Sequence, residues 1–350
     1  MTRSDRSPHG GELPSGVVRI AVDLLGGDGA PAVVVDGALR ACSADPDLHL
    51  ILVGPREPAG EVIGALAVGD RERVSVIAVD SVIAMADSPL RNIRRETTVR
   101  AAAEAVYTGR ADAMVSAGSS GAAVAASAHV LGRLRGVRRP GLAARVPTER
   151  GPVLLVDVGV TLDATMLELV QHAVLGTAFA AVGLGIARPR VGLLSIGSEP
   201  GKGDRLRRAV SVALSDVPLP AGGRYVGLVE GFDVPRGGPA DVVVTDGFTG
   251  NILLKGIEGA ITASRGGSKI SDVYGTRPHE AAAVLLGVAG DVVVCHGSAG
   301  GAEVADGIAL AARLHRDRIT PAVAGLADDL LTELSSAGGL TIRDALGEHS

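Results

Sequence analysis

The sequence predicts a doubly wound α/β protein, in which helices cover both faces of a mostly parallel sheet. Its apolar stretches are near-continuous rather than alternating, as expected for parallel strands that are buried on both faces. Several of these stretches stop abruptly at small and polar residues, as in Val22 to Gly26, Met114 to Gly118 and Val293 to Gly297. With 350 residues and 46% hydrophobic content, the chain is long enough to bury a large core.

The expected elements follow one another in a strand–helix alternation. Strands are expected to begin near Val17, Leu48, Val74, Ala113, Val153, Val191, Tyr225, Val242 and Val292. Helices are expected at 97–107, 121–134, 167–182 and 302–313, and the polar segment 264–280 is expected to be a loop or a short helix.

No internal repeat or low-complexity linker divides the chain. We therefore expect one α/β domain with two closely joined lobes over residues 17–335. The polar residues 1–16 lack the apolar region of a secretory signal and are expected to form a disordered tail, and 336–350 a second tail.

Composition excludes several classes of function. Aromatic residues make up 2% of the chain and tryptophan is absent, so stacking on bases is not expected and nucleic acid is a poor candidate partner. The two cysteines, Cys42 and Cys295, have neither metal-ligand nor disulfide spacing, which fits a reducing cytoplasm. The longest apolar window, 281–295, is interrupted and shorter than the roughly 20 residues of a membrane span.

Two strand-to-helix breaks carry the most chemistry. In Asp241 to Lys255, a strand breaks into a glycine-rich turn and resumes as a helix, which places Asp246 and Asn251 where open α/β sheets bind ligands. In Ser116-Ala-Gly-Ser-Ser-Gly121, amides and hydroxyls converge on a helix N-terminus, where anions bind. The alternative for the second break is that Ser119 or Ser120 is only an N-cap.

Three further groups have a functional and a structural interpretation. Lys202, between two glycines, suits a phosphate or a developing oxyanion, or is simply a solvent-exposed lysine in a turn. His296 follows a buried strand and is either a phosphate ligand, a proton shuttle or a core histidine. The arginines around the Gly-Pro turn dock an acidic partner or form a solvated or subunit-facing surface; they are Arg133, Arg135, Arg138, Arg139 and Arg145.

Six motifs in order carry a family resemblance. They are Ala21-Val-Asp-Leu-Leu-Gly-Gly-Asp28, Ser116-Ala-Gly-Ser-Ser-Gly-Ala122, Leu131-Gly-Arg-Leu-Arg-Gly136, Val191-Gly-Leu-Leu-Ser-Ile-Gly197, Thr245-Asp-Gly-Phe-Thr-Gly-Asn251 and His296-Gly-Ser298. The chain resembles the bacterial acyl-carrier-protein:phosphate acyltransferases over roughly residues 18 to 315, and the run from Asp241 to Gly259 is the most specific part.

The resemblance implies transfer of a fatty acyl group from acyl carrier protein to inorganic phosphate, giving acyl phosphate for phospholipid synthesis. It implies a three-layer α/β fold shared with isocitrate dehydrogenases and phosphotransacetylases, a homodimer in the cytoplasm, and no metal or nucleotide cofactor. Lys202 and Asn251 match the catalytic lysine and asparagine. The residues expected to bind phosphate or substrate are Ser116, Gly118, Ser119, Ser120, Gly121, Asp246, Gly247 and His296.

Several motif positions depart from the family pattern. A run of basic residues followed by two serines is reduced to Arg94-Arg-Glu-Thr-Thr98, Ser119-Ser120 replaces Asn-Thr, and Val160-Thr161 replaces Ala-Asn. Ser195 replaces an asparagine and Phe232 an arginine. The short polar segment 264–280 stands where the family has two long amphipathic helices that touch the membrane, so membrane contact is not carried over. The alternatives are a non-catalytic or regulatory paralogue that binds acyl carrier protein and a same-fold acyltransferase with another acyl donor.

Overall fold

The computed structural model describes residues 16–82, 95–264 and 282–336, and in them one eleven-stranded sheet of order β3-β2-β1-β4-β11-β10-β5-β6-β9-β7-β8. The strands are β1 (Val18–Asp23), β2 (Leu48–Gly54), β3 (Val74–Ala78), β4 (Ala113–Ser116), β5 (Gly141–Val146), β6 (Val153–Val156), β7 (Arg190–Ser195), β8 (Arg224–Glu230), β9 (Val242–Val244), β10 (Ala282–Leu286) and β11 (Asp291–Cys295).

The sheet consists of two parallel wings joined by two antiparallel central strands. The first wing, β3-β2-β1-β4-β11, and the second wing, β6-β9-β7-β8, are each parallel throughout. The central strands β10 and β5 pair antiparallel with each other and with β11 and β6. These three reversals turn the second wing against the first, so the carboxyl ends of the two wings lie at opposite edges of the sheet.

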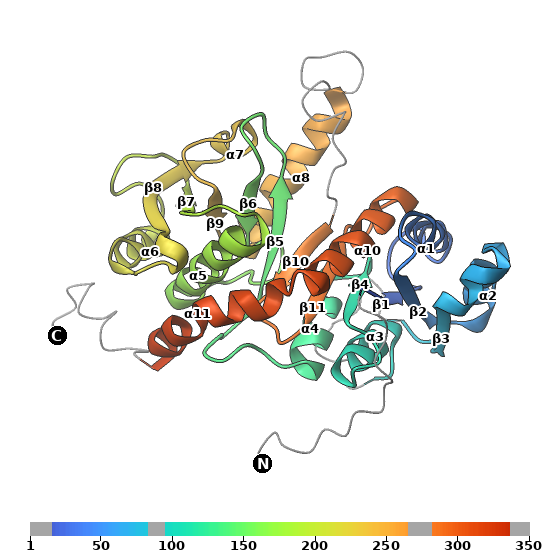
Figure 1. Cartoon of the computed structure of the whole chain (residues 1–350). Helices are drawn as coiled ribbons and strands as arrows, with labels where there is room; N and C mark the ends of the chain where they lie inside the picture. The colour runs from blue at the N-terminus through green and yellow to red at the C-terminus, as the bar shows by residue number, and fades with distance from the viewer. Residues whose placement is uncertain (1–15, 83–94, 265–281, 337–350) are drawn as a thin grey trace.

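Helices cover both faces of the sheet (Figure 1). One face carries α1 (Ala32–Ala44), α2 (Arg56–Ala65), α5 (Met166–Gly183), α6 (Arg205–Asp216), α10 (Gly301–Arg316) and α11 (Ile319–Ser336). The other carries α3 (Thr98–Tyr107), α4 (Ser120–Val130), α7 (Asp233–Arg236) and α8 (Gly247–Ser264). Two 3-10 turns, η1 (Val68–Arg73) and η2 (Pro220–Gly222), precede strands β3 and β8.

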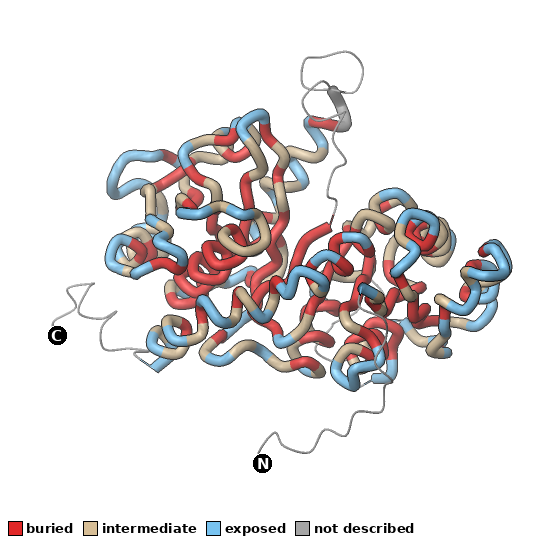
Figure 2. The backbone as a smooth tube through the Cα atoms, viewed as in Figure 1, coloured by how far each residue is buried: buried red, intermediate tan, exposed pale blue. Residues whose placement is uncertain are grey.

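Each face has its own hydrophobic core, and buried residues run along the strands through the middle of the molecule (Figure 2). Side chains alternate between the two cores along a strand. In β5, Ala143 belongs to the core under α5 and α10, whereas Leu142 and Ala144 belong to the core under α3, α4 and α8. Three layers of this kind confirm the predicted doubly wound, mostly parallel fold.

The nine expected strands and four expected helices are present within a few residues of their predicted positions. The central strands were missed. The interrupted apolar window 281–295 was expected to hold one strand, near Val292, but in the described part it folds as a hairpin of β10 and β11 around Gly287. Strand β5 contains two alanines and an arginine, a weak strand signal. The expected loop at 264–280 lies almost wholly outside the described residues.

Within the described residues, one helix is long and apolar enough to cross a membrane. It is α5, and 78% of it is buried inside the protein. This burial is that of a core helix, packed against α11 and the second wing.

Candidate active site

A cavity of about 700 Å³ lies over the central strands, between loops of the first wing and helix α8 of the second. We call it the cleft. Its floor is apolar and includes Leu142 and Ala144 of β5, Ala283 of β10 and Val294 of β11. Asn251, Leu254, Lys255, Ile257, Glu258 and Ile261 of α8 form one wall. Asp28, Gly118, Ser120, His296, Gly297 and Ser298 from the first wing form the opposite wall.

Close packing of two loops builds the first wall. The buried Asp23 carboxylate accepts a hydrogen bond from Ser116 Oγ at 2.7 Å, and Ser116 Oγ in turn accepts one from the Gly118 N–H at 3.1 Å. A Cβ at Gly26 would lie 2.7 Å from the Gly118 nitrogen, so the loops meet only because this residue is glycine. Ser116 therefore holds Gly118 in place from below the cleft surface.

Burial raises the pKa of the Asp23 carboxyl above its ordinary value, and the hydrogen bonds from Ser116 and the Leu25 N–H offset part of that rise. Because the buried Asp23 carboxyl must accept these hydrogen bonds away from water, it fixes the geometry of the loops that donate them. We assign Asp23 to the support of the wall.

The N-terminus of α4 opens into the cleft. Ser119 is its N-cap, because Ser119 Oγ accepts a hydrogen bond from the Ala122 N–H at 3.4 Å. Gly118 and Ser120 line the cleft, whereas Gly121 is exposed and does not. The two interpretations of this break thus fall on neighbouring residues: Ser119 caps the helix, and Ser120 faces the space where an anion would sit.

Helix α8 is seated on a loop that follows β6. The buried Asp157 carboxylate accepts hydrogen bonds from the N–H groups of Leu142, Gly159, Val160 and Thr161 at 2.7 to 3.2 Å. A Cβ at Gly247 would lie 2.7 Å from the Val160 nitrogen, and one at Gly250 would overlap the Asp157 carbonyl oxygen. The glycines of this motif thus let the helix approach the loop.

Asn251 is placed in the cleft by this seat. Its Nδ2 donates to the Val158 carbonyl at 3.1 Å, which uses one of the two N–H bonds of the amide. The second N–H remains for a ligand. Asn251 and Lys255 are four residues apart, so they lie on the same side of α8 and both line the cleft.

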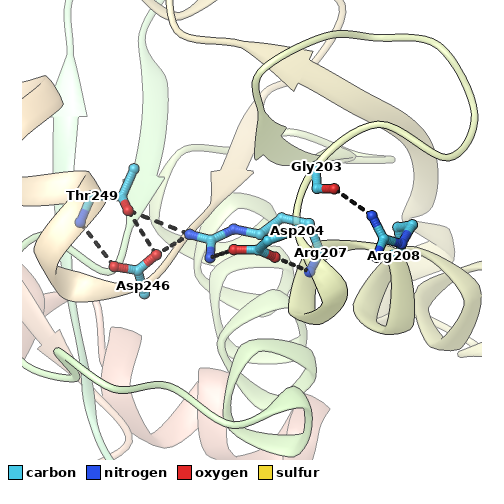
Figure 3. A network of polar contacts seen from close by, with 6 residues as sticks. All are labelled: Gly203, Asp204, Arg207, Arg208, Asp246 and Thr249. Atoms are coloured by element: carbon cyan, nitrogen blue, oxygen red, sulfur yellow. Dashed lines mark hydrogen bonds and ion pairs between the residues drawn. The ribbon is translucent and has the colours of Figure 1, made fainter.

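Asp246 holds the start of α8 rather than lining the cleft (Figure 3). It accepts hydrogen bonds from the Thr249 N–H and Oγ1, both at 2.8 Å, and pairs with the Arg207 guanidinium. Arg207 also pairs with Asp204 at 2.8 Å. Burial by itself raises the pKa of the Asp246 carboxyl, but the bonds from Thr249 and Arg207 outweigh it, and this pKa lies below its ordinary value.

His296 joins the two walls. Its Nε2 lies 3.2 Å from Lys255 Nζ and 3.3 Å from Glu258 Oε2, both on α8. Its Nδ1 lies 3.2 Å from Ser298 Oγ. The ring is thus in contact with an ammonium, a carboxylate and a hydroxyl at the polar end of the cleft.

Lys202 lies apart from these groups. It is exposed on the loop between β7 and α6 and is not among the residues that line the cleft. The structure therefore brings together Gly118, Ser120, Asn251 and His296 of the predicted site. Ser116, Ser119, Asp246 and Gly247 form its supports, and Gly121 and Lys202 stand outside it.

The family departures fall mostly into supporting positions. Thr97 caps α3 by accepting from the Arg100 N–H, and Thr161 contributes its N–H to the Asp157 cluster. Ser195 Oγ is buried without a hydrogen-bond partner among the described residues. Phe232 is 54% exposed, and the Arg236 guanidinium lies 5.7 Å from its ring centre, which returns a cation to this surface. Arg94 lies outside the described residues.

Five polar residues of the cleft were not singled out from the sequence, namely Lys255, Glu258, Ser298, Asp28 and Glu303. Lys255 and Glu258 carry a readable signal, since they follow Asn251 by one and two helical turns. Arg145 alone of the five clustered arginines lines the cleft, while Arg139 pairs with Glu168 at 3.1 Å. In the described ranges no group of three or more His, Cys, Asp or Glu residues could hold a metal ion.

Comparisons with known proteins agree with this architecture. A family model described as "Fatty acid synthesis protein" matches residues 18–265. The phosphate acyltransferases of Bacillus thuringiensis (strain Al Hakam) and Bacillus cereus (strain AH187) are each 42% identical over 249 residues, or 70% of this chain and 72% of theirs.

Solved structures share the fold at low sequence identity. A branched-chain phosphotransacylase from Enterococcus faecalis V583 superposes with a TM-score of 0.58 at 15% identity, covering 86% of this chain and 99% of that one. A phosphotransacetylase from Streptococcus pyogenes gives 0.56 at 18% identity, covering 88% and 94%. The fold is thus that of the phosphotransacetylases, and by the identity of its sequence the chain belongs to the phosphate acyltransferase family of fatty acid synthesis proteins.

Proposed function

We propose that this protein transfers a fatty acyl group from the thioester of acyl carrier protein to inorganic phosphate in the cytoplasm, giving acyl phosphate for phospholipid synthesis. The observation that carries this proposal is the composition of the cleft. Its polar end holds Asn251, Lys255 and His296 beside the N-terminus of α4, and its floor is apolar. A phosphate and a fatty acyl group need these two environments side by side.

Phosphate binds at the polar end. The N-terminus of α4 offers the Ser120 amide in a region of positive helix-dipole potential, while the Gly118 N–H is engaged by Ser116 Oγ and shapes the wall beside it. His296 lies on the same wall, and Lys255 reaches it from the opposite wall, with 3.2 Å between Lys255 Nζ and His296 Nε2. The attacking phosphate oxygen and the thioester carbonyl then meet above Asn251, whose second N–H donates to the oxyanion that develops.

The acyl chain lies along the floor. Leu142, Ala144 and Val294 from the sheet and Leu254 and Ile257 from α8 present only hydrocarbon to the cleft. Each methylene that leaves water contributes about 0.8 kcal/mol, so this surface binds the chain that the thioester carries.

We also propose that the protein acts as a homodimer through the carboxyl edge of the second wing. Each of the four strands of this wing is followed by an exposed large apolar side chain, and such patches mark interfaces. They are Leu162 after β6, Ile196 after β7, Phe232 after β8 and Phe248 after β9. Lys202 stands on the same edge, so we propose that it acts across the interface in a second copy.

Exchange of subunits between two inactive variants tests this role of Lys202. Lys202→Ala and Asn251→Ala homodimers should each be inactive and should recover phosphate-dependent activity when their subunits are exchanged, because a mixed dimer then contains one intact site. No recovery after verified subunit exchange would contradict the action of Lys202 across the interface.

The activity itself is tested by release of free thiol from acyl-carrier-protein thioesters of several chain lengths, with and without phosphate. The wild-type protein should release thiol only with phosphate, and Asn251→Ala should lower the rate by about 100-fold or more. Gly256→Ala is the matched control, because a Cβ at that position of α8 meets nothing within 4 Å. Binding of carrier protein with no thiol release would instead identify a non-catalytic paralogue.

A further inference from the structure

The proposed reaction requires a proton transfer, and the contact between Lys255 and His296 lies where that transfer takes place. Hydrogen phosphate loses its proton when its oxygen becomes part of the acyl phosphate. The thiol group of the carrier leaves as a thiolate, with a thiol pKa near 8.5 by analogy with cysteine, and takes up one proton. One proton must therefore move from phosphate to sulfur in each turnover, with no other reactant consumed.

The two side chains are arranged for this transfer. Lys255 Nζ and His296 Nε2 are 3.2 Å apart at the polar end of the cleft, and Ser298 Oγ is 3.2 Å from His296 Nδ1. Lys255 comes from the second wing and His296 from the first, so the pair spans the cleft where both substrates meet. Glu258 Oε2, 3.3 Å from His296 Nε2, stabilises the imidazolium that forms when the ring takes up a proton.

Composition adds an independent observation. Only three of the 34 basic residues of this chain are lysines, and Lys255 is one of them. Arg145 of β5 is a second cation among the described residues that line the cleft. Arginine supplies positive charge, but its guanidinium does not give up a proton in proteins, whereas an ammonium does. A lysine in a chain that otherwise uses arginine fits a position where the proton itself is needed.

We propose that Lys255 and His296 form the proton relay of the acyl transfer. This inference rests on the function proposed above. His296 accepts the proton of hydrogen phosphate as the phosphate oxygen bonds to the carbonyl carbon. As the carbon–sulfur bond breaks, the Lys255 ammonium gives its proton to the departing thiolate. The protonated His296 then returns a proton to the Lys255 amine, so both groups end as they began.

Lys255→Arg and Lys255→Met separate charge from proton donation. With an acyl-carrier-protein thioester, Lys255→Arg should keep the KM for phosphate within about threefold of wild type but lower kcat by about 100-fold or more, because its charge remains and its proton does not transfer. Lys255→Met should lose both. Arg56→Met, which removes an exposed cation on α2, is the control for folding and general charge.

An acyl thioester of an aromatic thiol provides the decisive readout, because that thiol leaves as a stable thiolate without protonation. With it, the kcat deficit of Lys255→Arg should shrink by at least about tenfold relative to the alkyl thioester. A wild-type kcat for Lys255→Arg, or an equal deficit with both donors, would overturn the relay while leaving the acyltransferase intact. Absence of phosphate-dependent release by the wild-type protein would overturn both.

Discussion

The two parallel wings are built alike and used differently. In the first wing, the loops after β1, β4 and β11 pack tightly and point small groups and helix N-termini into the cleft. In the second wing, the loops after the strands carry exposed apolar side chains and an ion-pair network. Among the described residues of the second wing, those that line the cleft belong to α8, apart from Val158 in the loop after β6.

Strand direction explains this difference. The antiparallel central strands reverse the second wing, so its carboxyl ends lie at the edge opposite to those of the first wing. Ligands bind at the carboxyl ends of parallel strands. Because the carboxyl ends of the two wings lie at opposite edges, the loops that follow their strands cannot all reach the same ligand. The second wing contributes through a helix that begins at its own edge and lies over the central strands.

The largest effect on stability is expected where α8 packs on the loop that follows β6. Gly250→Ala places a Cβ against the Asp157 carbonyl and should lower the free energy of unfolding by about 3 kcal/mol or more, the upper range of overpacking. Gly256→Ala in the same helix meets open space and should stabilise by about 0.5 to 1 kcal/mol. Urea unfolding of both variants measures the contrast, and equal midpoints would show that α8 is not seated on this loop.

The ion-pair network of the second wing should make its stability depend on pH. Asp246→Asn should lower the free energy of unfolding at pH 7 by about 1.5 to 3 kcal/mol, because a nearly buried carboxylate loses its bonds to Arg207 and Thr249. The pKa of Asp246 is lower in the folded protein than its ordinary value of 3.8. Its contribution is therefore complete above about pH 4 and is lost as the pH falls through the lowered value.

Asp204→Asn is the matched control for that experiment. Asp204 pairs with the same guanidinium, but its side chain is 56% exposed, against 8% for Asp246. The asparagine introduced at position 204 can also cap a helix, as aspartate does. Its loss should be at most about 1 kcal/mol. A difference between wild type and Asp246→Asn that stays constant from pH 7 to pH 3 would argue against the ion pair as the cause.

Two neighbouring serines in the first wing are expected to have different roles: Ser119 caps a helix, and Ser120 binds phosphate. Ser119→Ala should lower the free energy of unfolding by about 0.5 to 2 kcal/mol through loss of the cap. Ser120→Ala should act on the KM for phosphate, raising it severalfold, since this residue faces the cleft. Thermal unfolding and phosphate titrations check the two outcomes, and the reverse pattern would assign the binding role to Ser119.

The sequence indicated the wings better than their connection. Parallel strands buried on both faces leave continuous apolar runs, and their ends were recognisable from Gly26, Gly118 and Gly297. The central strands gave no comparable pattern, because β5 is alanine-rich and β10 merges with β11 in one apolar run. Those strands form the floor of the cleft and reverse the second wing. The location of the cleft could therefore not be predicted from the sequence.

The same limit applies to single residues. His296 could be found because it follows β11 directly, and Asn251 because it lies in the glycine-rich motif that connects β9 to α8. Lys255 acquires its meaning only from contact with His296, 41 residues later in the chain. Asp246 follows a strand as well, yet its carboxylate is engaged by Arg207, which no local pattern connects to it.

The central claim is that groups from both wings act on one phosphate in the cleft. A double-mutant cycle on kcat/KM for phosphate, with Ser120→Ala from the first wing and Lys255→Met from the second, tests it most directly. The two losses should couple by about 0.5 kcal/mol or more, as for residues that share one ligand. Losses that add within about 0.3 kcal/mol would mean that the two side chains act independently, and would contradict a phosphate site shared between the wings.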